Sequence, residues 1–408
     1  MGLVPDRVHT SPIADPGSLT DLLDGDDSVS CWIRHGDGMI GIGAAHRATF
    51  RTAAQAEAWW TDLVASTPAT RDAGVADEPM TGPVAFVSFP FAPDGPHEIV
   101  VPRRIVGRRE GVCWMTTWDG DETDDTPART PAGTDTPTGA DLCFHHASLG
   151  HDGWTAAVSD AVAAIHAGGV DKVVLARDEV AVADDPIDLP RVLARLASMY
   201  PQTWTFAVRN LVGASPELLV RQDRGLITSR VLAGTIHGDL DDSVLADALS
   251  SSSKDLAEHE FAVASVADAL RPHVTSLHVP EVPFVLQLPN VMHLASDITG
   301  AVRGGSTVLE LADAIHPSAA VCGTPTNAAR DLIATLEHLD RGRYAGPVGW
   351  INAAGDGEIA LALRCGMIEG ATARIFAGCG IVADSDPEAE WDETVAKLLP
   401  MKQALGAR

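Results

Sequence analysis

The chain has no long uncharged apolar run. Hydrophobic residues make up 45% of its 408 residues, but they are spread along the sequence, and no run reaches the roughly 20 residues that a membrane-spanning helix needs. The first residues, MGLVPDRVHTSPIADPG, also lack the basic region followed by an apolar one that marks a secretory signal. We therefore expect a cytoplasmic protein without a membrane partner.

Basic residues are also few. The chain has 29 lysines and arginines against 56 aspartates and glutamates, which gives a net charge of −27. This excess of negative charge makes nucleic acid and anionic membrane surfaces unfavourable partners. A small anion can still bind where a pocket supplies arginine, lysine, backbone N–H groups or a metal ion.

Cysteine pairs are absent. The six cysteines are scattered and none forms a C-x-x-C pair, which argues against a zinc ribbon and a disulfide scaffold and predicts reduced, mostly buried thiols. The segment AEHEF also fails as a zinc motif, because a zinc protease needs a second histidine four residues after His259 and position 263 is valine. Glu258 in this segment suits Mg²⁺ better than zinc, although a solvated acidic patch explains these residues equally well.

Composition divides the chain at residues 119–141. This segment is acidic, rich in threonine, proline and glycine, and has no large apolar residue, so it is predicted to be a surface loop or linker. Residues 1–118 precede it. Residues 142–408 follow it and contain the motifs to which chemistry can be assigned.

Runs of β-branched residues predict strands, and apolar residues at helical spacing predict helices. The predicted strands are Pro83–Phe89, Glu98–Gly107, Lys172–Ala183, Thr203–Val208, Glu217–Val220, Leu226–Gly234, Pro347–Asn352, Glu358–Ile368 and Ala373–Gly378. The predicted helices are Trp154–Ile165, Lys254–Leu270, Ala328–His338 and a segment that begins after Asp386. Without regular βαβ alternation, this order predicts an α+β fold with antiparallel sheets flanked by helices.

The C-terminal stretch GCGIVADSDPEAEWDETVAK is the most informative segment. Its glycines predict a turn, and Asp386 followed by Pro387 predicts a helix start. On that helix Glu390, Glu393 and Lys397 share one face because they are three and four residues apart. Two carboxylates and a lysine beside a glycine loop suit a divalent cation with an anionic ligand; a solvated face with a Glu–Lys pair is the alternative.

The segment EIALALRC predicts a strand with two different faces. Large apolar residues occupy one face, whereas Ala360, Ala362 and Arg364 occupy the other. An arginine in such a hollow suits a carboxylate ligand, and an arginine paired with an internal acid is the alternative. Lys172 and Glu217 each stand at a strand start, but spacing alone does not pair them as base and acid.

Nine motifs between Trp154 and Leu405 occur together in one order. They are KVVLAR, GASPELL, LAGT, KDLAEHE, HPSAAVCGTP, YAGPVGW, ALRC, FAGCGIV and EWDETVAK. This set resembles the chorismate-utilising enzymes. The resemblance implies a single large chorismate-binding α+β fold, with residues 142–408 as its catalytic region and residues 1–118 as a weakly matched part of the same fold.

Two positions select a branch of this family. Lys172 resembles the enzymes that use water as nucleophile, because anthranilate synthases usually have glutamine there. Aminodeoxychorismate synthases have a nucleophilic lysine where this chain has Ala233. The segments HPSAAVCGTP and LRC resemble the isochorismate synthases, with salicylate synthase as the alternative within the family. A catalytically silent anion- or metal-binding protein is the alternative from another class.

The resemblance also implies roles for individual residues. Lys172 and Glu217 would be the catalytic base and acid, and Glu258 and Glu393 would hold Mg²⁺, with Glu390 close by through water. The implied substrate-binding residues are Gly234, Thr235, His293, Tyr344, Arg364, Gly378, Gly380 and Lys397. The implied partner is the small molecule chorismate, the implied product feeds menaquinone or siderophore synthesis, and we expect a monomer.

Overall fold

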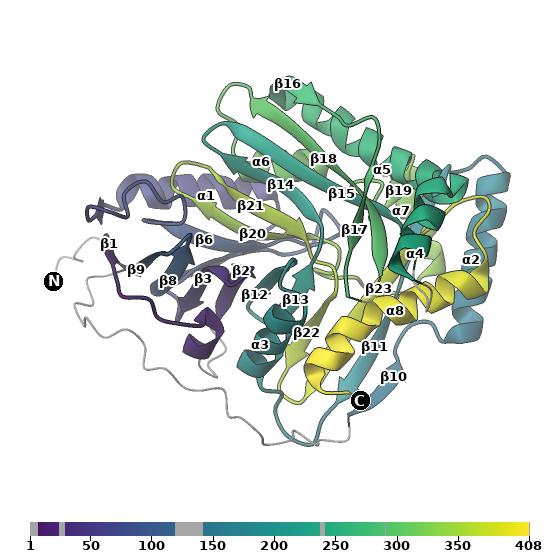
Figure 1. Cartoon of the computed structure of the whole chain (residues 1–408), viewed down its shortest axis with the longest axis horizontal. Coiled ribbons are helices and arrows are strands. Elements are labelled where there is room, and N and C mark those ends of the chain that lie inside the picture. The colour runs from purple at the N-terminus through teal and green to yellow at the C-terminus, as the bar shows by residue number, and fades with distance from the viewer. Residues whose placement is uncertain (1–6, 24–28, 119–141, 237–240, 290, 408) are drawn as a thin grey trace.

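Two large, mainly antiparallel sheets form the protein, as the computed structural model in Figure 1 shows. The structure describes residues 7–23, 29–118, 142–236, 241–289 and 291–407. The predicted linker at residues 119–141 lies outside them. Among the described residues, each strand pairing is antiparallel except that between β1 and β5, and the predicted α+β class is confirmed.

The first sheet contains strands from both ends of the chain. Its order is β10 (Cys143–His146), β11 (Lys172–Val182), β23 (Thr372–Ile381), β22 (Cys365–Glu369), β13 (Leu211–Ser215), β12 (Trp204–Val208), β2 (Ser30–Arg34), β3 (Asp37–Ile42), β8 (Arg104–Arg109), β9 (Val112–Trp118), β1 (Val8–Pro12) and β5 (Ala69–Arg71), with β19 (Gly323–Thr324) paired to β11. The pairing of β12 with β2 joins the segments on either side of residues 119–141.

The second sheet is also continuous across that division. Its order is β16 (Val274–His278), β18 (Met292–Val302), β15 (Leu226–Ile236), β14 (Leu218–Asp223), β21 (Gly357–Leu361), β20 (Pro347–Asn352), β6 (Val84–Ser88), β7 (His97–Val101) and β4 (His46–Phe50), with β17 (Phe284–Gln287) paired to β18. Here β20 pairs with β6.

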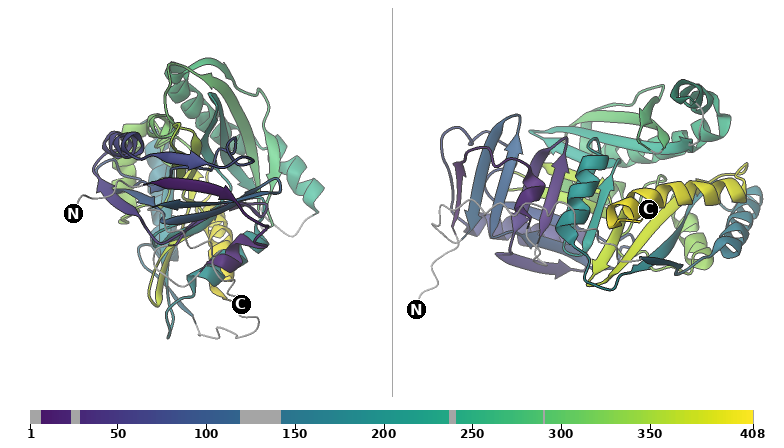
Figure 2. Two further views of the ribbon diagram at one scale, coloured as in Figure 1. Left: turned by 90° about the vertical axis from the view of Figure 1, so that its left-hand side faces the viewer. Right: turned by 60° about the horizontal axis from the view of Figure 1, so that its bottom comes forward.

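Helices cover the outer faces of the sheets (Figures 1 and 2). They are α1 (Ala53–Ser66), α2 (His151–His166), α3 (Leu189–Met199), α4 (Asp242–Ser251), α5 (Ser253–Leu270), α6 (Val308–Ile315), α7 (Thr326–Leu336) and α8 (Pro387–Leu405), with short 3₁₀ turns at Leu19–Leu22 and Arg271–His273. The predicted cap of α8 is confirmed, because Asp386 Oδ1 accepts a hydrogen bond from the N–H of Ala389 at 3.0 Å.

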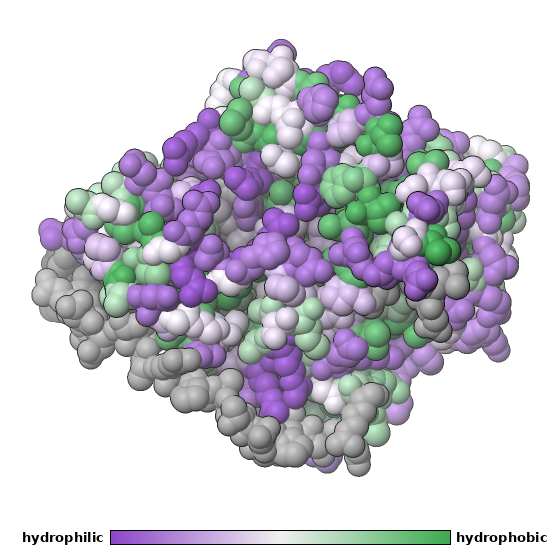
Figure 3. Space-filling model, viewed as in Figure 1, coloured by the Kyte–Doolittle hydropathy of each residue, from purple (hydrophilic) through white to green (hydrophobic). Residues whose placement is uncertain are grey.

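The core has two main parts, one on each face of the first sheet. Phe206 and Leu211 belong to the larger cluster, which includes residues of both sheets, whereas their neighbours Ala207 and Val212 belong to a cluster with residues of α3 and α8. This alternation follows from the two-residue period of a strand that is buried on both faces. Helix α5 contacts β15 of the second sheet, and α8 contacts β23 of the first. On the surface, hydrophilic side chains cover most of the face drawn in Figure 3.

Three sequence predictions are wrong, two about strands and one about a turn. The predicted strand Glu358–Ile368 is two strands, β21 in the second sheet and β22 in the first, because the chain crosses between sheets at Ala362–Arg364 and Arg364 adopts a left-handed φ of 46°. The predicted strand Glu98–Gly107 is likewise divided between β7 and β8. The predicted glycine turn at Gly378–Gly380 is part of β23 and pairs with β11.

No described helix, within the ranges given above, is long and apolar enough to cross a membrane.

Candidate functional site

A pocket lies where strands pass from one sheet to the other. Glu217 follows β13 of the first sheet and precedes β14 of the second, and Arg364 lies on the return crossover from β21 to β22. The two crossovers are bonded to each other, since the N–H of Leu361 donates to the Glu217 carbonyl and the N–H of Ala214 donates to the Arg364 carbonyl, both at 3.1 Å. The sheet topology therefore brings an acid and an arginine together.

The pocket has an empty volume of about 660 Å³, including its open mouth. Ten of the thirteen predicted site residues line it. Lys172 and Glu393 contact the lining residues Glu258 and Lys397, whereas Glu390 contacts Lys254. The ten are Glu217, Gly234, Thr235, Glu258, His293, Tyr344, Arg364, Gly378, Gly380 and Lys397.

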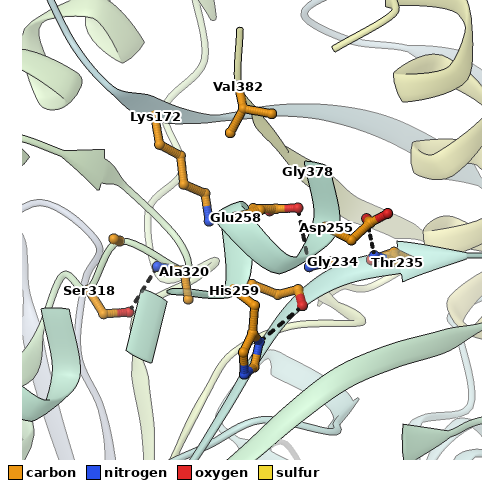
Figure 4. Close-up of polar contacts among 12 residues, drawn as sticks. Lys172, Gly234, Thr235, Asp255, Glu258, His259, Ser318, Ala320, Gly378 and Val382 are labelled. Carbon is orange, nitrogen blue, oxygen red and sulfur yellow. Dashed lines mark hydrogen bonds and ion pairs between the residues drawn. The ribbon is translucent and has the colours of Figure 1, made fainter. Parts of the chain in front are cut away.

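Lys172 is fully buried and points toward Glu258 of α5 (Figure 4). Its Nζ lies 3.2 Å from Glu258 Oε1. Gly380 of β23 makes this approach possible, because a Cβ there would lie 1.9 Å from Glu258 Oε1 and 2.9 Å from Lys172 Cε. The glycine in the strand is thus explained by side-chain room and not by a turn.

Glu217 is 5% exposed, and this burial raises the pKa of its carboxyl to about 8. A backbone hydrogen bond from Leu232 and the charges of Lys172, Lys397 and Arg364 act in the opposite direction without cancelling the effect. A buried carboxyl is hard to ionise because the charged form loses its hydration. Near neutral pH Glu217 is therefore a proton donor within the pocket.

Arg364 and His293 form a hydrogen-bonded chain. Arg364 Nη2 donates to His293 Nε2 at 2.9 Å, so Nε2 accepts and Nδ1 carries the proton that His293 shares with Thr235 Oγ1 at 3.0 Å. Burial and then the charge of Arg364 hold the pKa of His293 well below its usual value. The histidine is neutral, and it orients the guanidinium without competing for an anion.

The other terminal nitrogen of Arg364, Nη1, is buried without a hydrogen-bond partner. Burial lowers the pKa of Arg364 to about 10, so the side chain remains charged near neutral pH. A buried cationic N–H group without an acceptor is costly. A carboxylate in the pocket would supply that acceptor.

Tyr344 lies beside this arginine at the start of the YAGPVGW motif. Its ring stacks on Phe376 with centroids 5.0 Å apart, and its hydroxyl would lie 3.0 Å from a Cβ at Gly378. Burial raises the pKa of Tyr344, so its hydroxyl remains protonated and can donate a hydrogen bond.

The β-bulge at Gly234 and Thr235 of β15 is held by two carboxylates of α5 (Figure 4). The Gly234 N–H donates to Glu258 Oε2 at 3.2 Å, and the Thr235 N–H donates to Asp255 Oδ1 at 3.3 Å. Gly234 has a φ of 79°, which a glycine adopts without strain. Glu258 therefore contacts both the pocket backbone and Lys172.

Three predicted residues of α8 follow the spacing expected from the sequence. Glu393 pairs with Lys397 on the same helix, and Lys397 Nζ also donates to the Gly378 carbonyl at 3.0 Å. Glu390 is 1% exposed and accepts a hydrogen bond from Lys254 Nζ of α5 at 2.7 Å. Burial and then the charge of Glu393 raise the pKa of Glu390.

These carboxylates have the donor chemistry of a magnesium site. Glu258, Glu390 and Glu393 supply only oxygen donors, which hard cations prefer. The negative charges of Glu390 and Glu393 repel each other, so a cation between them would be stabilising. In this arrangement each pairs with a lysine, and within the described residues no group of three or more His, Cys, Asp or Glu is arranged to hold a metal ion. The residue types fit Mg²⁺, whereas the present side-chain positions do not converge on an ion.

Lys254 and Asp255 belong to the site, although their roles were not predicted from the sequence. Both stand in the quoted motif KDLAEHE, and both bond to groups of the site. Of the residues that follow them, His259 is internal and bonds to the Ala233 carbonyl and to Ser296, whereas Glu260 is exposed. The unusual run of charges at a helix start was the available signal.

Comparisons of the sequence and the structure with known proteins all indicate the same family. A family model described as "Chorismate binding enzyme" matches residues 32–406. The chain is 38% identical over 265 residues to the isochorismate synthase MenF of Bacillus subtilis (strain 168), a match that covers 63% of this chain and 56% of that protein. It is 41% identical over 264 residues to the isochorismate synthase DhbC of the same strain, covering 61% of this chain and 66% of that protein.

A solved structure is similar over nearly the whole chain. It is MenF, the menaquinone-specific isochorismate synthase of Escherichia coli, with a TM-score of 0.81 and 25% sequence identity, covering 98% of this chain and 95% of that chain. The two sequence matches span less than two thirds of the length of each Bacillus relative. The family model covers most of the sequence, and the chain therefore belongs to the chorismate-binding enzymes.

Proposed function

We propose that this protein is an isochorismate synthase, which adds water to chorismate at ring carbon C2 and expels the hydroxyl group from C4. The observation that carries the proposal is the buried carboxyl of Glu217, whose pKa is raised to about 8, in one pocket with Arg364. A leaving hydroxyl needs a proton, and an acid that remains protonated near neutral pH can supply it. The names of the relatives support the same activity.

The proposed proton transfers involve two residues. Lys172 acts as the general base and takes a proton from the water molecule whose oxygen bonds to C2. The ring double bonds shift, the C4–O bond breaks, and Glu217 donates its proton so that the hydroxyl departs as water. The composition of the ring compound is unchanged, and proton exchange with solvent restores both side chains.

The substrate is a dianion, and the pocket offers cationic and neutral donors for it. Arg364 Nη1 has no partner among the described residues, and we propose that it binds the enolpyruvyl carboxylate together with Tyr344 and the backbone at Gly378 and Gly380. Thr235 and His293 orient Arg364 through the hydrogen bonds described above, and the β-bulge at Gly234 shapes the opposite wall. We assign Lys397 to the ring carboxylate.

We also propose that the enzyme uses Mg²⁺, held by Glu258 and Glu393, with Glu390 acting through water. The ion would supply Lewis-acid stabilisation of the ring carboxylate and its conjugated diene. The oxygen-only donor set supports this assignment.

The proposed setting is a cytoplasmic monomer that produces isochorismate for menaquinone or siderophore synthesis. All six cysteines are free thiols, as is usual for proteins of a reducing compartment. Light scattering of the purified protein would test the oligomeric state.

The function is tested by chorismate turnover with the wild-type protein and Lys172→Ala. We expect wild-type conversion and a loss on the order of 10²–10⁴-fold in the variant, the usual range for a general base. Thermal unfolding of both proteins controls for folding. Near-normal turnover in a folded variant would remove Lys172 from the mechanism, and no turnover by the wild type would favour a catalytically silent binding protein.

A further inference from the structure

Lysine is rare in this chain, and most of the lysines contact the proposed metal ligands. There are four lysines among 408 residues, at positions 172, 254, 397 and 402. Three of them pair with the three proposed metal ligands: Lys172 with Glu258, Lys254 with Glu390 and Lys397 with Glu393. The fourth, Lys402, pairs with the buried Glu179 away from these carboxylates. The lysine positions therefore follow the negative charge of the site.

Lys254 is the one lysine of the three without a role in the proposed reaction. It lies in the first turn of α5, where a cation is disfavoured by the helix dipole. Its position needs a local cause, and the hydrogen bond of 2.7 Å to Glu390 of α8 provides one. This bond links α5 and α8, the two helices that carry the proposed metal ligands.

The charge environment of Lys254 extends beyond Glu390. Lys254 and Glu258 are four residues apart on α5, and Glu390 and Glu393 are three residues apart on α8, so each pair shares one helix face. The ammonium group that contacts Glu390 therefore lies on the same helix faces as the other two carboxylates. A divalent cation bound to the same carboxylates would meet a positive charge already in place.

We infer that Lys254 is the internal counter-ion of the metal site: it neutralises Glu390 and holds α5 to α8 in the metal-free protein, and it releases Glu390 when Mg²⁺ binds. The inference rests on the proposed Mg²⁺-dependent function. It implies that metal affinity is weakened by competition with a side chain.

The test is calorimetric titration of MgCl₂ into substrate-free protein at pH 8. Lys254→Gln keeps a polar side chain but removes the charge, so we expect Mg²⁺ to bind at least about tenfold more tightly, because a repulsion between like charges is lost. Lys254→Arg retains the charge and should bind Mg²⁺ like the wild type.

Lys402→Gln is the matched control. The Lys402–Glu179 pair has a distance of 2.6 Å and side chains 26% and 5% exposed, against 2.7 Å, 30% and 1% for Lys254–Glu390. Both glutamine variants should lower the melting temperature of the metal-free protein. Mg²⁺ should restore more of that loss in Lys254→Gln than in Lys402→Gln, because at one Mg²⁺ concentration a ligand that binds more tightly stabilises the folded protein more.

Unchanged or weaker Mg²⁺ binding by Lys254→Gln would overturn the inference, as would the absence of Mg²⁺ binding in every protein tested. If Lys254→Gln does not fold, Lys254→Arg decides the matter: the inference requires wild-type affinity, and a large change in either direction overturns it. The titration contains no chorismate. Its outcome is therefore separate from the turnover measurement that decides the isochorismate synthase proposal.

Discussion

Glu217 combines the chemistry and the electrostatics of the site in one residue. Its carboxyl is ordinary in sequence, and the raised pKa arises from the crossover that buries it between the two sheets. The burial of Glu217 could not be predicted from sequence spacing, because the crossover depends on a hydrogen bond with Leu361, which is far along the chain. Its proposed role came from family resemblance.

We predict that Glu217→Gln becomes more stable relative to the wild type as pH rises. The folded pKa of about 8 lies above the ordinary value of 4.5, so the folded carboxyl binds its proton more tightly than the unfolded one. The stability linked to that proton is fully present below about pH 4.5 and is lost as pH rises through about 8. Over this window the wild type should lose on the order of a few kcal/mol that the variant retains.

Urea unfolding of both proteins between pH 5 and 9 measures this difference. Chorismate turnover provides a second readout: the variant should be about 10²–10⁴-fold slower, and wild-type turnover should fall above pH 8 as Glu217 ionises. A stability difference that does not change with pH would show that Glu217 ionises normally.

We predict that Gly380→Ala lowers turnover by about 100-fold, since a displacement of about an ångström in a catalytic site can have that effect. The new Cβ would overlap Glu258 Oε1 and crowd Lys172. Gly169→Ala is the control, because its Cβ would have no neighbour closer than the Ala164 carbonyl at 3.5 Å. Equal turnover by the two variants would show that room at Gly380 is not required.

At the scale of elements, local patterns predicted helices and strands well where one face is continuously buried. The predicted strand Pro347–Asn352 matches β20, and the predicted helix Lys254–Leu270 matches α5 within one residue. The segment Glu358–Ile368 was wrongly predicted as one strand because its alternation of large and small residues continues through the crossover. The left-handed backbone of Arg364 ends the strand there. The glycines of β23 were wrongly predicted to form a turn. They are required by close neighbours that sequence does not show, the Leu175 carbonyl at Gly378 and the Glu258 carboxylate at Gly380.

Helix α8 owes its position to a buried arginine of β11. Arg177 is fully buried; its Nε donates to Thr394 Oγ1 at 2.8 Å, and its guanidinium lies 4.0 Å from the ring centroid of Trp391. Because Thr394 follows Glu393 directly, this bond also fixes the face that carries the site residues.

We predict that Thr394→Val destabilises the protein by about 1–3 kcal/mol, since it leaves a buried cationic N–H group without its acceptor. Thr335→Val removes an exposed hydroxyl that bonds to the Asp331 carbonyl, and it should change stability by no more than about 0.5 kcal/mol. Urea denaturation measures both, and similar small effects would contradict the proposed role of Arg177.

At the scale of the whole molecule, the site is assembled from residues that are distant in sequence. Lys254 and Glu390 are 136 positions apart, and the pocket takes residues from both sheets and from two helices. Composition and periodicity predicted the fold class but not this assembly, because neither reports which strands cross between sheets. The ordered motifs predicted which residues form the site. The geometry then explained how Glu217, Arg364 and His293 can act there.

Product analysis tests the central claim most directly. The protein is incubated with chorismate and MgCl₂ near neutral pH, the products are separated by chromatography, and pyruvate is measured with lactate dehydrogenase. We predict isochorismate as the main product, little pyruvate, and no turnover with excess chelator. Salicylate and pyruvate formed in equal amounts from chorismate would contradict the account and identify a salicylate synthase instead.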